Sequence, residues 1–283
     1  MSNPISANDV KRLRDMTNAP MMDCKKALGE AGGNMDKAVQ WLREQNKMKG
    51  EKVAARETAE GRIGIYIDPA KAVAAIVELR CESAPVAKSA IFIQLANDVA
   101  KHVALSAAPA SNADELLAQQ FVGDPKRTLK DRVEDAIGLI RENMKPARFA
   151  KLSGGQFGSY IHFDGTVGAL IQVEGSAAAD PQMLKEICMH ITFKQPAAAR
   201  REEVDPAVVE REREIAKHQA AQSGKPANIA DKIAEGKLKT WFAENVLVEQ
   251  PFVKDDSKTV GSLLQSAGLT VKKFIRFKVG ELT

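Results

Sequence analysis

The chain has 283 residues, of which 44% are hydrophobic and 28% charged, the balance of a globular protein long enough for two or three modules. Its net charge is only +4, so composition gives no sign of a nucleic-acid partner, which usually needs basic residues concentrated on one face. Neither an apolar signal segment nor an uncharged run long enough to span a bilayer is present, and we expect a soluble, cytoplasmic protein with no membrane partner.

The first 45 residues predict a compact helical module. Val10, Leu13 and Met16 recur at helical spacing, and "TNAP" interrupts that helix before a second one begins. "GGN" then ends the second helix, because glycine tolerates the left-handed geometry that closes helices, and a third helix follows. Residues 1–45 are therefore predicted as a three-helix bundle. The polar stretch 46–61 has no apolar face and is interpreted as a linker.

From residue 62 onward the hydrophobic residues alternate, which is typical of strands. "GRIGIYID" and "AVAAIVELRC" predict a hairpin, and "FIQLANDVAKHVALS" predicts the helix after it. The same order returns in "GQFGSYIHFDGTVGALIQVEG" and "PQMLKEICMHITF", so we predict a duplicated hairpin-plus-helix α+β core with halves at 62–150 and 151–203. Residues 112–150, between the repeats, look helical. The matching positions of the two predicted helices are Val99, His102 and Val103 in the first and Ile187, His190 and Ile191 in the second.

A segment with helical periodicity, residues 204–242, interrupts the β pattern. Asp205 and Pro206 predict its start, because aspartate caps helices and proline favours the first helical position. "QSGKP" breaks the pattern midway, which predicts an inserted helical hairpin with this pentapeptide at its tip. The remaining residues, 243–283, predict a helix and an alternating strand that complete the core.

The hairpin tip contains the triplet Ser223-Gly224-Lys225, which invites comparison with a phosphate-binding loop. That motif needs Gly-x-x-x-x-Gly-Lys-Ser/Thr directly after a strand. Here the first glycine is missing, a helix precedes the loop, and Pro226 offers neither an N–H nor a hydroxyl group. We therefore predict a turn between helices.

The histidines and cysteines show no spacing typical of a metal site. No histidine has a His or Cys partner three or four positions away on the same helix, and the cysteines lie far apart, as expected of reduced thiols. No Gly-x-Ser-x-Gly nucleophile motif is present either. We therefore predict no metal, no cofactor and no catalytic residue. The residues considered are His102, His162, His190, His218, Cys24, Cys81 and Cys188.

The pair Met21-Met22, at the start of the second predicted helix, has two interpretations. Neighbours on a helix point roughly 100° apart, so one methionine can pack inward while the other faces solvent. An exposed methionine is an adaptable contact for a partner, whereas methionine is more often a core residue. The spacing alone leaves both interpretations open.

Several segments together resemble bacterial elongation factor Ts, the family of nucleotide-exchange factors of elongation factor Tu. They run in order over nearly the whole chain, and "MMDCKKAL", "QSGKP" and "QPFV…KTVG" are the most specific of them. The full set is "VKRLRDMTNAPMMDCKKAL", "IRENMKPARF", "GSYIHFDGTVGALI", "VVEREREIAKHQAAQSGKP", "EGKLKTWF", "QPFVKDDSKTVGSLL" and "FIRFKVGE".

The resemblance implies a ubiquitin-associated-like N-terminal module, a two-part α+β core and an inserted antiparallel coiled-coil hairpin through which two copies could form a homodimer. It implies a protein that is not an enzyme but binds elongation factor Tu, both GDP-bound and nucleotide-free, and promotes GDP release. One set of residues would contact the nucleotide domain of that partner, and His162 would contact its third domain. The first set is Lys11, Arg14, Met21 and Met22. This favours the exposed interpretation of the methionine pair.

One loop departs from the family pattern. Where the family typically reads Cys-Glu/Gln-Thr-Asp-Phe-Val-Ala, this chain has Ala84 and Pro85 in place of the Asp-Phe pair. In the family that phenylalanine inserts into the nucleotide domain and, with the aspartate, disturbs the magnesium and phosphate site. We therefore expect weakened or altered exchange, or a partner whose pocket Pro85 fills; the alternative function is a non-catalytic protein-binding scaffold. The loop comprises Cys81, Glu82, Ser83, Ala84, Pro85 and Val86.

Overall fold

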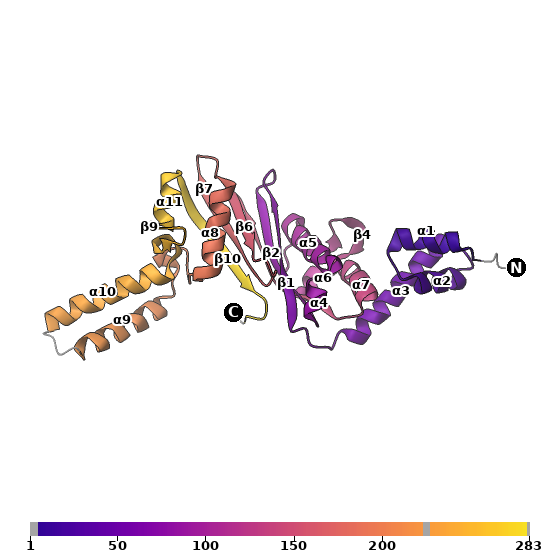
Figure 1. The fold of residues 1–283 in the computed structure, drawn as a ribbon, viewed down its shortest axis with the longest axis horizontal. Helices are drawn as coiled ribbons and strands as arrows, with labels where there is room; N and C mark the ends of the chain where they lie inside the picture. The colour runs from indigo at the N-terminus through magenta and orange to yellow at the C-terminus, as the bar shows by residue number, and fades with distance from the viewer. Residues whose placement is uncertain (1–4, 223–226, 282–283) are drawn as a thin grey trace.

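The computed structural model describes residues 5–222 and 227–281 and is mixed helix and sheet, in agreement with the predicted α+β class. Figure 1 shows an elongated arrangement, with a helical module at the N-terminal end, sheets in the middle and a helical hairpin at the opposite end. The predicted hairpin tip, Ser223 to Pro226, lies outside the described residues. In the described residues, no helix combines the length and the apolar character that crossing a bilayer requires.

The N-terminal module consists of short helices around a small apolar core. Its helices are α1 (Ala7–Thr17), α2 (Met21–Glu30) and α3 (Met35–Val53). Ser6 starts α1 with a capping box, since its side chain accepts from the N–H of Asp9 while the Asp9 carboxylate accepts from the N–H of Ser6. The shared core consists of Val10, Leu13, Ala19, Cys24, Ala27, Leu28, Ala38 and Leu42.

The linker predicted at 46–61 is wrong for its first half, because α3 continues through it. Gly50 is buried there, where α3 packs across α7 (Leu129–Ile140). The two helices approach closely, since a Cβ on Gly138 would lie only 2.0 Å from Oδ1 of Asn46. Glycine at the crossing adds no large apolar side chain, so the sequence pattern looked polar although this face is buried.

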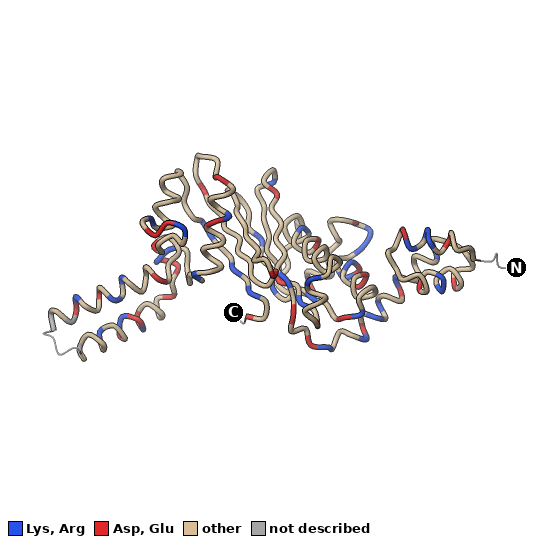
Figure 2. Tube along the Cα trace, viewed as in Figure 1, with Lys and Arg blue, Asp and Glu red and all other residues tan. Residues whose placement is uncertain are grey.

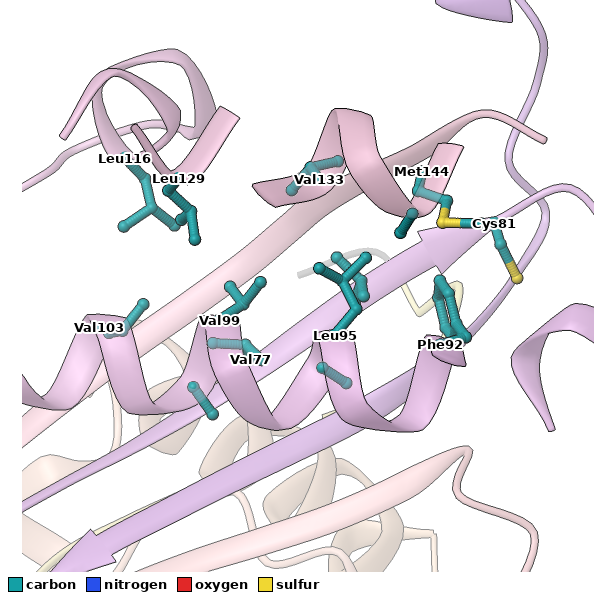
Figure 3. Close-up of a cluster of buried hydrophobic side chains, with 14 of the residues drawn as sticks. Val77, Cys81, Phe92, Leu95, Val99, Val103, Leu116, Leu129, Val133 and Met144 are labelled. Atoms are coloured by element: carbon teal, nitrogen blue, oxygen red, sulfur yellow. The ribbon is translucent and has the colours of Figure 1, made fainter. Parts of the chain in front are cut away.

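The first half of the core is an antiparallel sheet in the order β1-β2-β5, covered by helices. Its elements besides α7 are β1 (Glu60–Asp68), β2 (Val73–Cys81), α4 (Ala84–Ala87), α5 (Ala90–Leu105), α6 (Ala113–Ala118), β3 (Gln120–Phe121), β4 (Asp124–Thr128) and β5 (Met144–Ser153). Figure 3 shows side chains of α5, among them Leu95 and Val99, facing Leu129 and Val133 of α7. The predicted hairpin and helix are confirmed.

The helical prediction for 112–150 is right only for α6 and α7. The short hairpin β3–β4 lies between those helices, and β5 follows them. Pro146 disguises β5, because proline cannot donate to a neighbouring strand. The structure accommodates this proline next to a bulge in the pairing with β2, on a strand that lies at the edge of its sheet.

The second half of the core repeats this design with a sheet in the order β10-β7-β6. Its elements are β6 (Gln156–Ile161), β7 (Val167–Gly175), α8 (Pro181–Lys194), β8 (Pro251–Phe252), β9 (Asp255–Thr259), α11 (Val260–Ser266) and β10 (Leu269–Lys278). The predicted hairpin, the helix after it, and the final helix and strand are confirmed. Helix α8 packs on β6 and β7 as α5 packs on β1 and β2.

The duplication extends further than the hairpin and helix. His102 of α5 bonds through Nε2 to Oε1 of Gln119 (3.0 Å) and accepts at Nδ1 from the N–H of Val122 (3.3 Å). His190 of α8 repeats both bonds, to Gln250 (2.8 Å) and from the N–H of Val253 (3.2 Å). Since Nδ1 accepts in both rings, the proton must sit on Nε2, and each buried histidine is a neutral structural residue.

The helical hairpin stands between α8 and β8, the place that α6 takes in the first half. Its helices are α9 (Pro206–Ala221) and α10 (Ala227–Asn245), and the Asp205 side chain caps α9 as predicted by accepting from the N–H of Ala207. Small residues, Ala216 and Ala234, are buried where the helices meet. At its base the hairpin packs against the core through Val204, Phe242 and Val246.

The two halves are joined through apolar and buried charged side chains. Ile63, Ile76, Leu170 and Phe277 are among the buried residues of one cluster that both sheets share. Glu78 is 1% exposed, and its carboxylate accepts from Arg148 Nε (2.6 Å) and from the N–H of Gly280 (2.9 Å). Arg148 in turn donates to the Lys278 carbonyl (2.7 Å). The end of β10 is therefore fixed to the sheet of the first half.

Candidate partner interface

The first set of predicted contacts lies on the surface of the N-terminal module. Lys11 and Arg14 are exposed on α1, and Met21 and Met22 are 43% and 72% exposed on α2. Neither methionine therefore packs into the core. Helix α2 buries Cys24, Ala27 and Leu28, so Met21 lies at the rim of the buried face and Met22 nearly opposite to it.

Met16 is a surface residue that the sequence pattern misplaced. Its spacing from Val10 and Leu13 predicted a core position, but its side chain is 56% exposed at the end of α1. It lines a cleft of about 260 Å³ between the module and α7. Lys49 and Asp23, 3.1 Å apart, lie in the same cleft, and Lys49 Nζ also donates to the Gly138 carbonyl at 3.5 Å. These contacts attach the N-terminal module, which carries the exposed methionines, to the core.

The loop that departs from the family pattern is held by hydrogen bonds at its start, whereas its tip is exposed. Ser83 donates to the Glu142 carboxylate through its hydroxyl (2.6 Å) and its N–H (3.1 Å). Glu82 accepts from the N–H of Asn143 at 2.6 Å. Ala84 and Pro85 begin the short helix α4 and are exposed. The structure therefore presents an alanine and a proline on a rigid base, where the family pattern has a carboxylate and an aromatic ring.

The other residues of this loop support it rather than face solvent. Cys81 is buried, and Val86 is half-buried against the core of the first half. Burial raises the pKa of the Cys81 thiol to about 12, so it is protonated at neutral pH. Among the described residues, no three or more His, Cys, Asp or Glu side chains are grouped so that they could hold a metal ion.

His162 lies in the turn between β6 and β7, well away from the N-terminal module (Figure 1). The Tyr160 hydroxyl lies 3.1 Å from Nδ1 of His162 and orients its half-buried ring. The N–H of Ile63 donates to the Gly165 carbonyl (2.8 Å), which attaches the turn to β1. The structure thus separates His162 from the first set of predicted contacts, as two distinct surfaces of a partner would require.

Phe163, next to His162, is 89% exposed and was not singled out by its sequence. In "YIHFDGT" the aromatic residue continues the alternating pattern of a strand, so its spacing resembles that of a packed residue. One signal was present in the sequence: Asp164-Gly165 is typical of a turn, and a residue beside a turn lies beyond the covered part of the strand.

Charge does not single out one face for a partner. Figure 2 shows basic and acidic residues interspersed along the described helices and strands, without an extended segment of one sign. On α9 the two signs alternate and pair, as in Arg213–Glu210 and Lys217–Glu214. Contact with a partner would therefore depend on particular side chains rather than on a strong overall field.

The comparisons with known proteins agree on one family. A family model described as elongation factor TS matches residues 85–281. The chain is 38% identical to elongation factor Ts of Aquifex aeolicus, over 98% of this chain and 99% of that protein. It is 42% identical to elongation factor Ts of Methylococcus capsulatus, over 98% of this chain and 92% of that protein. These matches, over the fold described above, define the class as translation elongation factors. Within that class, the chain belongs to the elongation factor Ts family.

Proposed function

We propose that this protein binds the GDP-bound form of elongation factor Tu and promotes GDP release by stabilising the nucleotide-free form. The observation that carries this proposal is the match to elongation factor Ts relatives over 98% of the chain. The finer assignments belong to the same proposal: a ubiquitin-associated-like N-terminal module, a coiled-coil hairpin, and action without chemical catalysis.

The physics of such a factor is linkage between two ligands. A protein that binds the nucleotide-free partner more tightly than the GDP-bound one must weaken GDP binding by the same factor. About 1.4 kcal/mol of differential binding changes the GDP affinity tenfold. Exchange therefore needs contacts that differ between two states of the partner, and no acid, base or metal on this chain.

The contacts that we propose are divided between the N-terminal module and the turn between β6 and β7. Lys11, Arg14, Met21 and Met22 would hold the nucleotide domain of elongation factor Tu, and their exposure supports this assignment. His162 would contact the third domain of the partner. A homodimer through α9 and α10 stays a prediction, which sedimentation of the free protein at several concentrations would check.

We propose further that exchange by this protein is weakened or altered. Ala84 offers no carboxylate, and Pro85 is smaller than the phenylalanine of the family pattern, whose ring would contribute a large buried area. Both positions are exposed, so the loop can touch a partner but lacks the usual groups for disturbing its magnesium and phosphate site. A cognate partner with a reshaped pocket, filled by Pro85, is the other explanation.

The alternative function is a non-catalytic scaffold that binds elongation factor Tu without strong exchange activity, and the Ala84-Pro85 pair is the observation that favours it. A binding titration distinguishes the two. We expect the protein to form a stoichiometric complex with nucleotide-free elongation factor Tu and to lose it as GDP is added. A complex whose affinity is the same with and without GDP would identify the scaffold, and no complex at all would refute both functions.

A further inference from the structure

Phe163 is the most exposed of the large hydrophobic side chains in the described residues, at 89%. A phenyl ring in water gains much from burial, because aromatic side chains bring a large apolar area into any contact they make. Single exposed hydrophobic residues are common and need no explanation by themselves. Phe163 is different because the backbone on both sides of it is hydrogen-bonded.

The turn that presents Phe163 is fixed by backbone hydrogen bonds. The N–H of His162 donates to the Val167 carbonyl (2.8 Å), and the N–H of Gly165 donates to the His162 carbonyl (2.8 Å). Gly165 has φ 81°, a conformation that favours glycine. The N–H of Ile63 on β1 also donates to the Gly165 carbonyl (2.8 Å), which ties the turn to the first half of the core. The backbone therefore needs little further ordering when a partner binds.

The ring itself is part of an aromatic group. Phe163 lies against His162, with ring centroids 4.6 Å apart and planes at 57°, and the Tyr160 hydroxyl lies 3.1 Å from Nδ1 of His162. The side chain at the tip of the turn is thus continuous with the residue that the resemblance assigns to the partner contact. One partner surface that covers His162 would also meet Phe163.

Polar groups surround this apolar tip. Burial raises the pKa of Asp164, but hydrogen bonds from Thr166 and the electrostatic attraction of His162 outweigh this effect, so the pKa lies below its ordinary value and the group is ionised at neutral pH. Arg62 lies against the same turn, since its guanidinium would be 2.4 Å from a Cβ placed on Gly165. An aromatic centre with a polar, hydrated rim is the usual anatomy of a residue that dominates the affinity of an interface.

We propose that Phe163 is an anchor residue that inserts into an apolar pocket of elongation factor Tu, beside the contact made by His162. This inference rests on the proposed function. The pocket that fits is uncharged, lined by aliphatic or aromatic side chains, and wide enough for one phenyl ring. A group that pairs with the Asp164 carboxylate would suit its edge.

The test compares Phe163→Ala with Phe193→Ala. Phe193, at the end of α8, is 69% exposed and serves as the matched control, because it is an exposed phenyl ring that the proposal does not place in the contact. Affinity for nucleotide-free elongation factor Tu is measured by titration calorimetry, and thermal melting checks the fold. We expect Phe163→Ala to bind at least tenfold more weakly with an unchanged melting temperature, while Phe193→Ala binds within about twofold of the wild type.

A second variant locates the ring during binding. Phe163→Trp should retain most of the affinity, and its extra tryptophan emission, relative to the wild type, should shift to shorter wavelength when the partner is added. Wild-type affinity in Phe163→Ala, or an unshifted emission in a bound Phe163→Trp, would overturn the anchor while leaving the proposed function intact. A wild-type protein that does not bind elongation factor Tu would overturn both. Self-association of the free protein that Phe163→Ala abolishes would assign the ring to a second copy instead.

Discussion

In the loop around Ala84 and Pro85, some residues stabilise the fold and others are exposed to a partner. Ser83 is bound twice by the Glu142 carboxylate, and Glu82 accepts from Asn143, so the path of the loop depends on these buried or half-buried groups. The exposed pair at its tip makes no comparable contribution. Its side chains can therefore be exchanged without rebuilding the loop, which makes the pair suitable for a test of function.

The methionines of α2 give a residue-level prediction. Met22→Ala should change the free energy of unfolding by less than about 0.5 kcal/mol, because the side chain is 72% exposed. It should weaken binding to elongation factor Tu about tenfold, because a large flexible contact is lost. Chemical unfolding and titration calorimetry measure the two effects. Met48→Ala, 50% exposed on α3, is the matched control; equal binding by both variants and the wild type would remove Met22 from the interface.

The two halves of the core share a structural feature, a buried histidine on the helix that covers each sheet. His102 connects α5 to the short hairpin β3–β4, and His190 connects α8 to the short hairpin β8–β9. Both histidines are neutral. The repeat is also visible in the sequence, as "QFVGDPKRT" in the first half and "PFVKDDSKT" in the second. The sequence interpretation compared only the first hairpin and the helix of each half, and it therefore missed the hairpin β3–β4.

Acid should weaken the fold through these histidines. Burial lowers the pKa of His102 and His190, and the charge of Lys194 lowers that of His190 further. Below about pH 6.5 these histidines bind more protons in the unfolded chain than in the folded one. Their contribution to the free energy of unfolding is therefore fully present above that pH. It falls as the pH drops, by up to about 1.4 kcal/mol per pH unit and per histidine.

Urea unfolding at pH values from 7.5 to 5 measures this slope. The variant His190→Gln replaces the imidazole by an amide that does not titrate and can still hydrogen-bond to Gln250. We expect the variant to lose part of the pH dependence of the free energy of unfolding, although it is less stable than the wild type at pH 7. A slope between pH 7 and 5.5 that is identical in the variant and the wild type would show that His190 does not titrate as described.

The helical hairpin is an element whose outer part should be dispensable for folding. Ala216 and Ala234 pack only within the hairpin, whereas Phe242 and Val246 at its base pack against the core. Replacement of residues 213–235 by a short glycine linker should therefore leave one cooperative thermal transition, shifted by less than about 4 °C. A deletion that also removes Phe242 is the control that should lose stability; loss of cooperativity in the shorter deletion would show that the hairpin belongs to the core.

At the scale of the whole molecule, periodicity predicted the parts that repeat and have one apolar face. The two hairpin-plus-helix units and the final strand followed from spacing, and the start of α9 after Asp205 followed from the capping preferences of its first residues. The strand β5 did not, because Pro146 breaks its alternation, and the length of α3 did not, because Gly50 buries a face without a large apolar side chain.

The assembly of the parts was beyond the sequence pattern. The ion pair of Glu78 with Arg148 and its bond to Gly280 join segments far apart in the chain, and no local spacing encodes them. The candidate contacts Lys11, Arg14 and His162 came from resemblance to a family, and only the structure could show how far apart α1 and the hairpin β6–β7, which carry them, lie (Figure 1). The exposure of Phe163 came from the structure, because the sequence interpretation did not use the turn signal of Asp164-Gly165 beside it.

We propose that this protein speeds GDP release from elongation factor Tu, to an extent limited by Ala84 and Pro85. Stopped-flow release of fluorescent GDP from the cognate elongation factor Tu tests it most directly, with the wild type compared with the double variant Ala84→Asp/Pro85→Phe at saturating concentration. We predict release faster than the spontaneous rate with the wild type, and faster again by about tenfold with the double variant. Release at the spontaneous rate with both proteins would contradict the exchange function, and full activity of the wild type with no gain in the variant would contradict the role given to this pair.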